Sequence, residues 1–127
     1  MKKMGINNVI SIPVSLDNFF RYWFEFLKPF HRLTEREIDV IASFVKQRYL
    51  LSKVVSSQEV LDKLIMSEDT KRAVREECNI TQAHFQVIMT KLKKSKVIEN
   101  GKINPKFIPR LKEESDGFQL LLSFNFK

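Results

Sequence analysis

The sequence has few of the residues that cross-link or break a chain. Of its 127 residues, one is cysteine, three are glycine and four are proline. The single Cys78 excludes a disulfide framework, and its place on the apolar side of a predicted helix favours a reducing compartment. The low glycine and proline content argues against bulk disorder.

Long apolar runs are absent as well. The apolar residues that follow the first lysines are interrupted by Asn8 and Pro13, so neither a signal peptide nor a membrane span is expected. We therefore expect a protein made and kept in the cytosol, with residues 1–127 forming a single domain.

Residues that carry catalysis or bind metals are scarce. The two histidines, His31 and His84, do not form a metal-ligand spacing with the one cysteine, and neither a GxxxxGK loop nor a GxSxG motif occurs. Glu35, Glu37 and Asp39 lie in the first turns of a predicted helix, where capping and the helix dipole explain them. We expect no catalytic residue, metal or cofactor, and no enzymatic activity.

What the chain has in excess is positive charge in one region. The net charge is +7, and residues 80–112 carry eight lysines and arginines against one acid. Such a basic surface is typical of a nucleic-acid binder, or of a protein that faces an acidic partner. A solvated, lysine-rich helix end favoured by the helix dipole is the plainer alternative.

The same region predicts a helix over residues 81–96 followed by a tight β-hairpin. Asn79 or Thr81 supplies the N-cap, and Asn100-Gly101 is the dipeptide that a type I′ turn favours because both residues take positive φ. The inward-facing residues of this helix are Phe85, Ile88, Met89 and Leu92.

Three further helices are predicted upstream. The first, over residues 33–51, opens with a capping box at Thr34 and Glu37, and the second opens with the same pattern at Ser56 and Glu59. Ser67 caps the third, which forms a helix-turn-helix pair with the helix at 81–96. Their inward-facing residues are Ile38, Ile41, Val45 and Tyr49, then Val60, Leu61, Leu64 and Ile65, then Val74 and Cys78.

Both ends of the chain are rich in apolar residues. Residues 8–16 alternate as a half-buried edge strand, and residues 19–30 form a helix so aromatic that it should be buried on every side. Residues 118–126 alternate as a second strand, which either pairs with strand 8–16 over the aromatic helix or adds to a neighbouring subunit.

Together these elements predict a mainly α, α+β domain that resembles a winged helix-turn-helix. Its small sheet would combine the N-terminal strand, the wing hairpin and the C-terminal strand. Within the single domain, residues 8–32 hold the N-terminal strand and aromatic helix, residues 33–104 the winged-helix core, and residues 105–127 the C-terminal extension.

Two segments resemble known DNA-binding families. LTEREIDVIASFV resembles the start of the DNA-binding domains of LuxR-type regulators and sigma-factor region 4, and KRAVREECNITQAHFQVIMTKLKK resembles their scanning and recognition helices. The resemblance implies that Thr81, Gln82, His84 and Gln86 lie near the major groove. This sequence departs from the pattern because about twenty residues, roughly 50–68, separate the two segments.

A winged-helix transcriptional regulator is accordingly one functional hypothesis. No arginine lies between residues 80 and 109, although arginine makes the commonest guanine contact, so nonspecific phosphate attraction is favoured over base reading. The candidate nucleic-acid-binding residues are Gln82, His84, Gln86, Lys91, Lys93, Lys94 and Lys102.

The chain as a whole, including NPKFIP and GFQLLLSFNFK, resembles small conserved proteins of crAss-like and related tailed bacteriophages. That resemblance implies a virion component, such as a neck or tail ring or connector subunit, assembled in the bacterial host cytoplasm. Its expected partners are other virion proteins and copies of itself in a ring, without a membrane. The predicted protein-interface residues are Phe19, Phe20, Trp23, Phe24, Val87, Phe118, Phe124 and Phe126.

Overall fold

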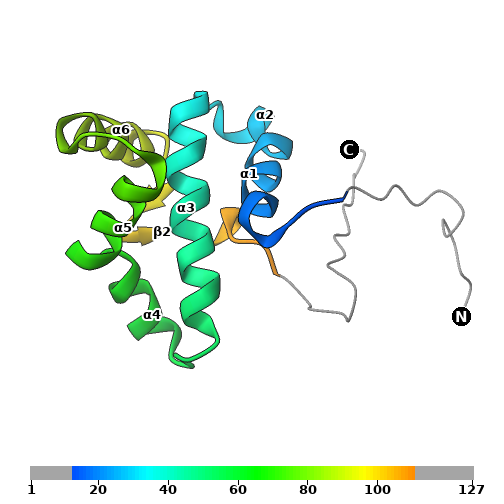
Figure 1. Cartoon of the computed structure of the whole chain (residues 1–127), viewed down its shortest axis with the longest axis vertical. Helices are drawn as coiled ribbons and strands as arrows, with labels where there is room; N and C mark the ends of the chain where they lie inside the picture. Colours follow the sequence, from blue (N-terminus) through cyan, green and yellow to red (C-terminus); the bar gives the residue numbers. More distant parts are fainter. Residues whose placement is uncertain (1–12, 111–127) are drawn as a thin grey trace, which may run out of the picture.

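The structure is a computed structural model that describes residues 13–110. A long central helix, α3 (Glu35–Ser52), runs through the molecule. Helices α1 (Leu16–Phe26) and α2 (Lys28–His31) lie on one side of it, and α4 (Gln58–Ile65), α5 (Glu68–Cys78) and α6 (Gln82–Lys94) lie on the other (Figure 1). The predicted mainly helical architecture is confirmed.

The start of α1 corrects the predicted N-terminal strand. Ser15 and Asn18 form a capping box: the Ser15 hydroxyl accepts from the Asn18 backbone N–H, and the Asn18 side chain accepts from the Ser15 backbone N–H. This local cap outweighs the period-two alternation, so a helix begins at Leu16 and residues 13–15 are not in a strand. Residues 8–12 of the predicted strand lie outside the described part.

The starts of α3 and α4 test the two predicted capping boxes. The first is confirmed, because the side chains of Thr34 and Glu37 each accept from the other's backbone N–H. The second is wrong by one residue: Ser57, not Ser56, is the N-cap, and its hydroxyl accepts from the Val60 N–H at 3.3 Å.

Helices α5 and α6 are joined by a three-residue turn. Ser67 caps α5 as predicted, and Asn79 ends it in the left-handed conformation with φ 53°. Thr81 is the N-cap of α6, so of the two residues proposed for that role the structure selects Thr81. The Arg75 guanidinium lies over the Phe85 ring, 5.4 Å from its centroid, and connects the two helices.

The predicted hairpin is present as β1 (Ile98–Glu99) and β2 (Lys102–Ile103), with Ile98 opposite Ile103. Asn100 and Gly101 both take positive φ, 58° and 74°, as a type I′ turn requires. Within residues 13–110 the sheet consists of these two strands alone, so the predicted contributions of the terminal strands to it are not seen there. The 3-10 helix η2 (Pro105–Phe107) follows.

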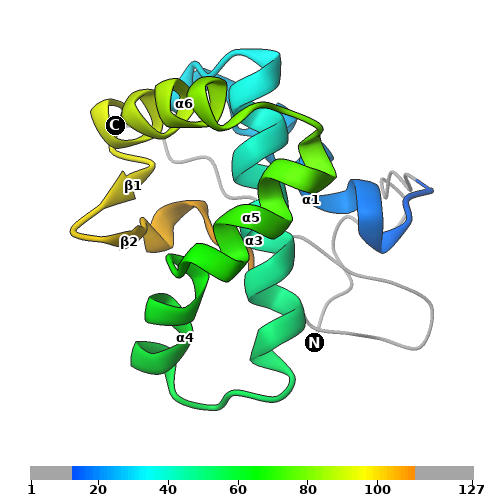
Figure 2. The ribbon, with the colours of Figure 1, turned by 60° about the vertical axis from the view of Figure 1, so that its left-hand side comes forward.

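One hydrophobic core joins all these elements around α3. The predicted inward face of α6 is confirmed, because all four of its residues are buried. On α3, Ile38, Ile41 and Val45 are buried, whereas Tyr49 is only partly buried against the core. The hairpin closes the core between α6 and α4 (Figure 2). The other large core side chains are Phe20, Phe24, Phe44, Leu61, Ile65, Val74, Val97, Ile98, Ile103 and Phe107.

Candidate functional site

Helix α6 and the hairpin present an exposed polar surface, hereafter the lysine face. The Thr81 hydroxyl caps the helix by accepting from the His84 backbone N–H at 3.1 Å. All seven side chains predicted as nucleic-acid contacts are exposed, six of them around α6 and Lys102 on β2: Gln82, His84, Gln86, Lys91, Lys93, Lys94 and Lys102.

The charge of the lysine face is only partly offset within the described chain, where Glu99 lies opposite Lys102 in the hairpin. None of its lysines forms an ion pair with another residue in the range 13–110, whereas most charges on α1, α3 and α5 do. Glu99 in the hairpin is the one exposed acid between residues 80 and 110. A surface of this kind attracts anions over about a Debye length, roughly 8–10 Å at physiological salt.

An apolar side chain interrupts the lysine face. Val87 is 60% exposed on α6, between Gln86 and the first of the lysines. It belongs to the predicted protein interface, and its exposure fits that role as well as contact with a thymine methyl group.

The aromatic helix is not buried on every side, and its predicted interface residues need correction. Phe20 and Phe24 lie in the chain's own core, so they are not available to a partner. Phe19 and Trp23 are half-buried against that core. Trp23 donates its indole N–H to the Phe107 carbonyl oxygen at 2.8 Å. The remaining predicted interface residues, Phe118, Phe124 and Phe126, lie outside the described residues.

The exposed aromatic side chains of this region are different ones. Tyr22, Phe26 and Phe30 are 49%, 52% and 74% exposed, and sequence reasoning assigned none of them to a surface. The signal was present in the spacing: Tyr22 and Phe26 are four residues apart, as are Phe20 and Phe24, so the two pairs occupy different faces of α1.

Helix α4 also exposes apolar residues that were predicted to be buried. Leu61 and Ile65 face the core, but Val60 and Leu64 are 47% and 38% exposed. The four residues form one stripe along α4 that is wider than the core can cover. Leu50 and Val54, at the neighbouring end of α3, are exposed as well. We call Val60, Leu64, Leu50 and Val54 the α4 apolar patch.

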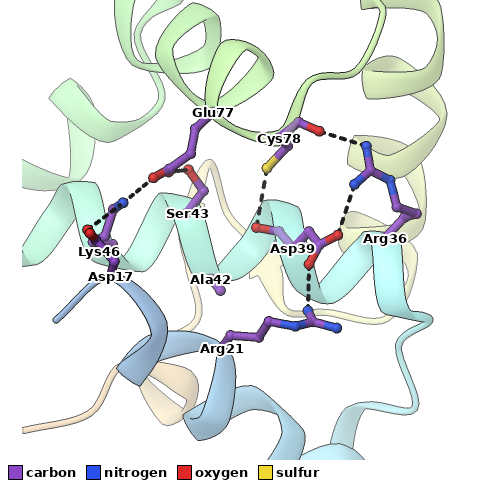
Figure 3. A pocket seen from close by; sticks show the side chains of 9 residues that line it. All are labelled: Asp17, Arg21, Arg36, Asp39, Ala42, Ser43, Lys46, Glu77 and Cys78. Atoms are coloured by element: carbon purple, nitrogen blue, oxygen red, sulfur yellow. Dashed lines mark hydrogen bonds and ion pairs between the residues drawn. The ribbon is translucent and has the colours of Figure 1, made fainter. Parts of the chain in front are cut away.

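A polar cleft lies between α1, α3 and α5. At one end the Asp39 carboxylate accepts from the guanidinium groups of Arg21 and Arg36, at 2.6 and 2.9 Å, and Arg36 also donates to the Cys78 carbonyl oxygen (Figure 3). At the other end Glu77 accepts from Lys46 and Ser43. Each charge in the cleft therefore faces an opposite one, and the cleft joins three helices.

The chemistry of the cleft is that of a structural network. Burial raises the pKa of the Cys78 thiol to about 11, helped by Asp39 and Glu77, so the thiol stays protonated near neutral pH. Burial alone would lower the pKa of Lys46, but the hydrogen bond and charge of Glu77 outweigh it and raise that pKa. The cleft thus offers neither a reactive thiolate nor an unpaired charge.

Comparison of the chain with models of known protein families, with curated proteins and with solved structures gives no match. Among residues 13–110, no cluster of three or more histidine, cysteine or acidic side chains is arranged to hold a metal ion. Over the same range, every helix is too short or too polar to cross a membrane.

Proposed function

We propose that this protein is a structural, subunit-binding module of a tailed-bacteriophage particle, as a ring or connector subunit of the neck or tail. It would work by protein–protein contact, with its core built as a winged helix-turn-helix from α3, α5, α6 and the hairpin. The resemblance to small proteins of crAss-like phages supplies the biological setting, and the surface of the described chain supplies the physical support.

The observation that carries the proposal is the α4 apolar patch. Val60 and Leu64 continue the stripe whose other half, Leu61 and Ile65, is in the core. Aliphatic side chains grouped at one end of a small protein favour a contact with another protein. Covering the exposed half of each of Val60 and Leu64 would contribute about 1 kcal/mol per side chain.

The lysine face would act alongside this contact rather than replace it. Its lysines lack ion-pair partners within residues 13–110, and arginine is absent from residues 80–109. Lysine is a flexible point charge that attracts phosphates or carboxylates without reading base edges. In a particle, this face would lie toward packaged DNA or an acidic protein surface.

Native mass spectrometry of the full chain tests the proposal. We expect oligomers of one defined size, consistent with a closed ring, because a head-to-tail contact that closes generates cyclic symmetry. A chain that remains monomeric or dimeric at every concentration contradicts the proposal.

The double variant Val60→Ser/Leu64→Ser tests whether the subunits contact each other through the α4 apolar patch. It should weaken each subunit contact roughly 30-fold, from about 2 kcal/mol of lost burial. Val87→Ser is the comparison variant, since Val87 is an exposed aliphatic residue on α6 that the sequence also assigns to the interface, so the two variants distinguish the two surfaces. Loss of the oligomer in the comparison variant but not in the double variant would move the interface to α6.

A sequence-specific DNA-binding regulator is the second candidate. It is favoured by the exposure of Gln82, His84 and Gln86 in the first half of α6, directly after a helix–turn–helix connection. Glutamine pairs with adenine through two hydrogen bonds in the major groove, and the lysines at the other end of α6 would contact phosphates.

Gel-shift titrations separate the two candidates. A regulator should bind one duplex at least ~10³-fold more tightly than random DNA. In that case Gln82→Ala/Gln86→Ala should remove the preference, whereas Lys93→Gln/Lys94→Gln should weaken all duplexes alike. A particle subunit should show only weak binding that falls steeply with salt.

A further inference from the structure

The aromatic residues exposed on α1 and α2 form a surface that the proposed function does not use. Tyr22 and Phe26 lie on the face of α1 opposite to the core residues Phe20 and Phe24, and Phe30 continues the same spacing onto α2. We call these three residues the aromatic row. Such side chains expose a large apolar area to water, which favours a covering segment.

The described chain ends beside this helix. The Phe107 carbonyl oxygen accepts from the Trp23 indole, and the Phe107 ring stacks on Phe24 with 6.4 Å between ring centroids. Pro109 is buried as well, and the coloured part of the ribbon ends shortly after this contact with α1 (Figure 1). Seventeen residues follow Arg110 in the sequence.

The length of that extension suits the aromatic row. The seven residues 111–117 span at most about 25 Å when extended, whereas α1 is about 16 Å long. A segment that begins at Phe118 can therefore reach any position along α1, including the side that faces away from Phe107.

The side chains of residues 118–126 also suit a contact with the aromatic row. In the sequence, every second position from Phe118 to Phe126 is apolar, and the positions between them are Gln119, Leu121, Ser123 and Asn125, so an extended segment would carry one fully apolar edge. A tether this short keeps the segment at a millimolar local concentration, which favours the row of the same molecule over that of a second copy.

We propose that residues 118–126 dock on the aromatic row of their own chain, with Phe124 and Phe126 among the contacting side chains. The segment would thereby cover the aromatic row, a surface that is separate from the α4 apolar patch. This inference does not rest on the proposed phage function, because it concerns a contact within one molecule.

Photo-crosslinking of the full-length protein tests it. The photoreactive analogue p-benzoylphenylalanine replaces Phe26, whose exposed ring leaves room for the added benzoyl group, and the crosslinked peptides are identified by mass spectrometry. We expect crosslinks from position 26 to residues 118–126, in a product that runs as a single chain on a denaturing gel. The same analogue at Val87, exposed on α6, should give none to that segment.

A second variant tests whether the crosslink from position 26 is specific. Adding Phe124→Ser/Phe126→Ser to the position-26 protein should reduce the crosslink to the level of the Val87 control, with an unchanged far-ultraviolet circular dichroism spectrum. Crosslinked dimers would assign the row to a second copy and overturn the proposal. Absence of crosslinks to residues 118–126 would overturn it as well.

Discussion

His31 is held neutral by two backbone groups. Its Nε2–H donates to the Phe24 carbonyl oxygen at 2.7 Å, and its Nδ1 accepts from the Leu33 N–H at 2.9 Å. The ring is buried beside Phe24 and Phe107. Burial is the largest influence and lowers the pKa of His31; the charge of Lys28 adds to this, and the hydrogen bond to Phe24 opposes it.

This lowered pKa makes stability depend on pH in a defined window. The unfolded chain binds a proton at His31 near pH 6.5, before the folded chain does, so its stabilising contribution is present above pH 6.5 and is lost as the pH falls toward the folded pKa. We expect His31→Gln to lower the free energy of unfolding at pH 7 by about 1–3 kcal/mol and to flatten its fall between pH 7 and 5.

Urea unfolding at a series of pH values measures this effect. His84→Gln is the matched control, because His84 is exposed on α6 and its replacement should change the free energy of unfolding by less than about 0.5 kcal/mol. The pH-dependent stability cannot be assigned to His31 if the His31→Gln and His84→Gln proteins lose stability in parallel from pH 7 to 5.

At the scale of elements, the features that sequence predicts well are those set by neighbours along the chain. The Thr34–Glu37 capping box, the Asn100-Gly101 turn and the inward face of α6 depend on local chemistry and spacing, and all are present. The start of α1 is hidden in the sequence because the alternation over residues 8–16 places Ser15 in a strand, whereas Ser15 caps the helix together with Asn18 and a cap overrides a weak alternation.

The exposed side of α4 was unpredictable for a different reason. The spacing of apolar residues identifies which of them lie on one stripe of a helix. How much of that stripe is covered depends on how the other helices pack against it, which the spacing does not contain. Val60 and Leu64 lie at its uncovered edge. The same limit applies to the polar cleft, whose partners Arg21, Asp39 and Glu77 come from three separate helices.

The N-cap of α4 gives a direct test at this scale. Ser57→Ala should lower the free energy of unfolding by about 1 kcal/mol, because it removes the acceptor for the Val60 N–H. Ser56→Ala should change it by less than about 0.5 kcal/mol, as exposed residues outside a cap usually do. Thermal melts followed by circular dichroism compare the two variants. A larger loss of stability in Ser56→Ala than in Ser57→Ala would show that Ser56 is the N-cap, as expected from the sequence.

At the scale of the whole molecule, α1 is joined to the segment that follows the hairpin. Phe24 stacks on Phe107, and Trp23 is hydrogen-bonded to the backbone of the same residue. These contacts connect residues more than eighty positions apart in sequence. They make α1 part of the core rather than an appended helix.

We therefore expect one cooperative unfolding transition. Trp23 fluorescence, which reports on α1, should change at the same denaturant concentration as the far-ultraviolet circular dichroism signal. Phe24→Ala should lower the free energy of unfolding by about 3–5 kcal/mol, since it opens a cavity beside Phe107. A fluorescence transition that clearly precedes loss of helix would instead show that α1 unfolds separately.

The two limits of the described chain, Pro13 and Arg110, both emerge on the α1 side of the molecule, away from α4, α5 and α6 (Figure 1). A surface or a neighbouring molecule held against these two limits would therefore face α1. The lysine-bearing helix α6 would then point the other way, into the bulk solution.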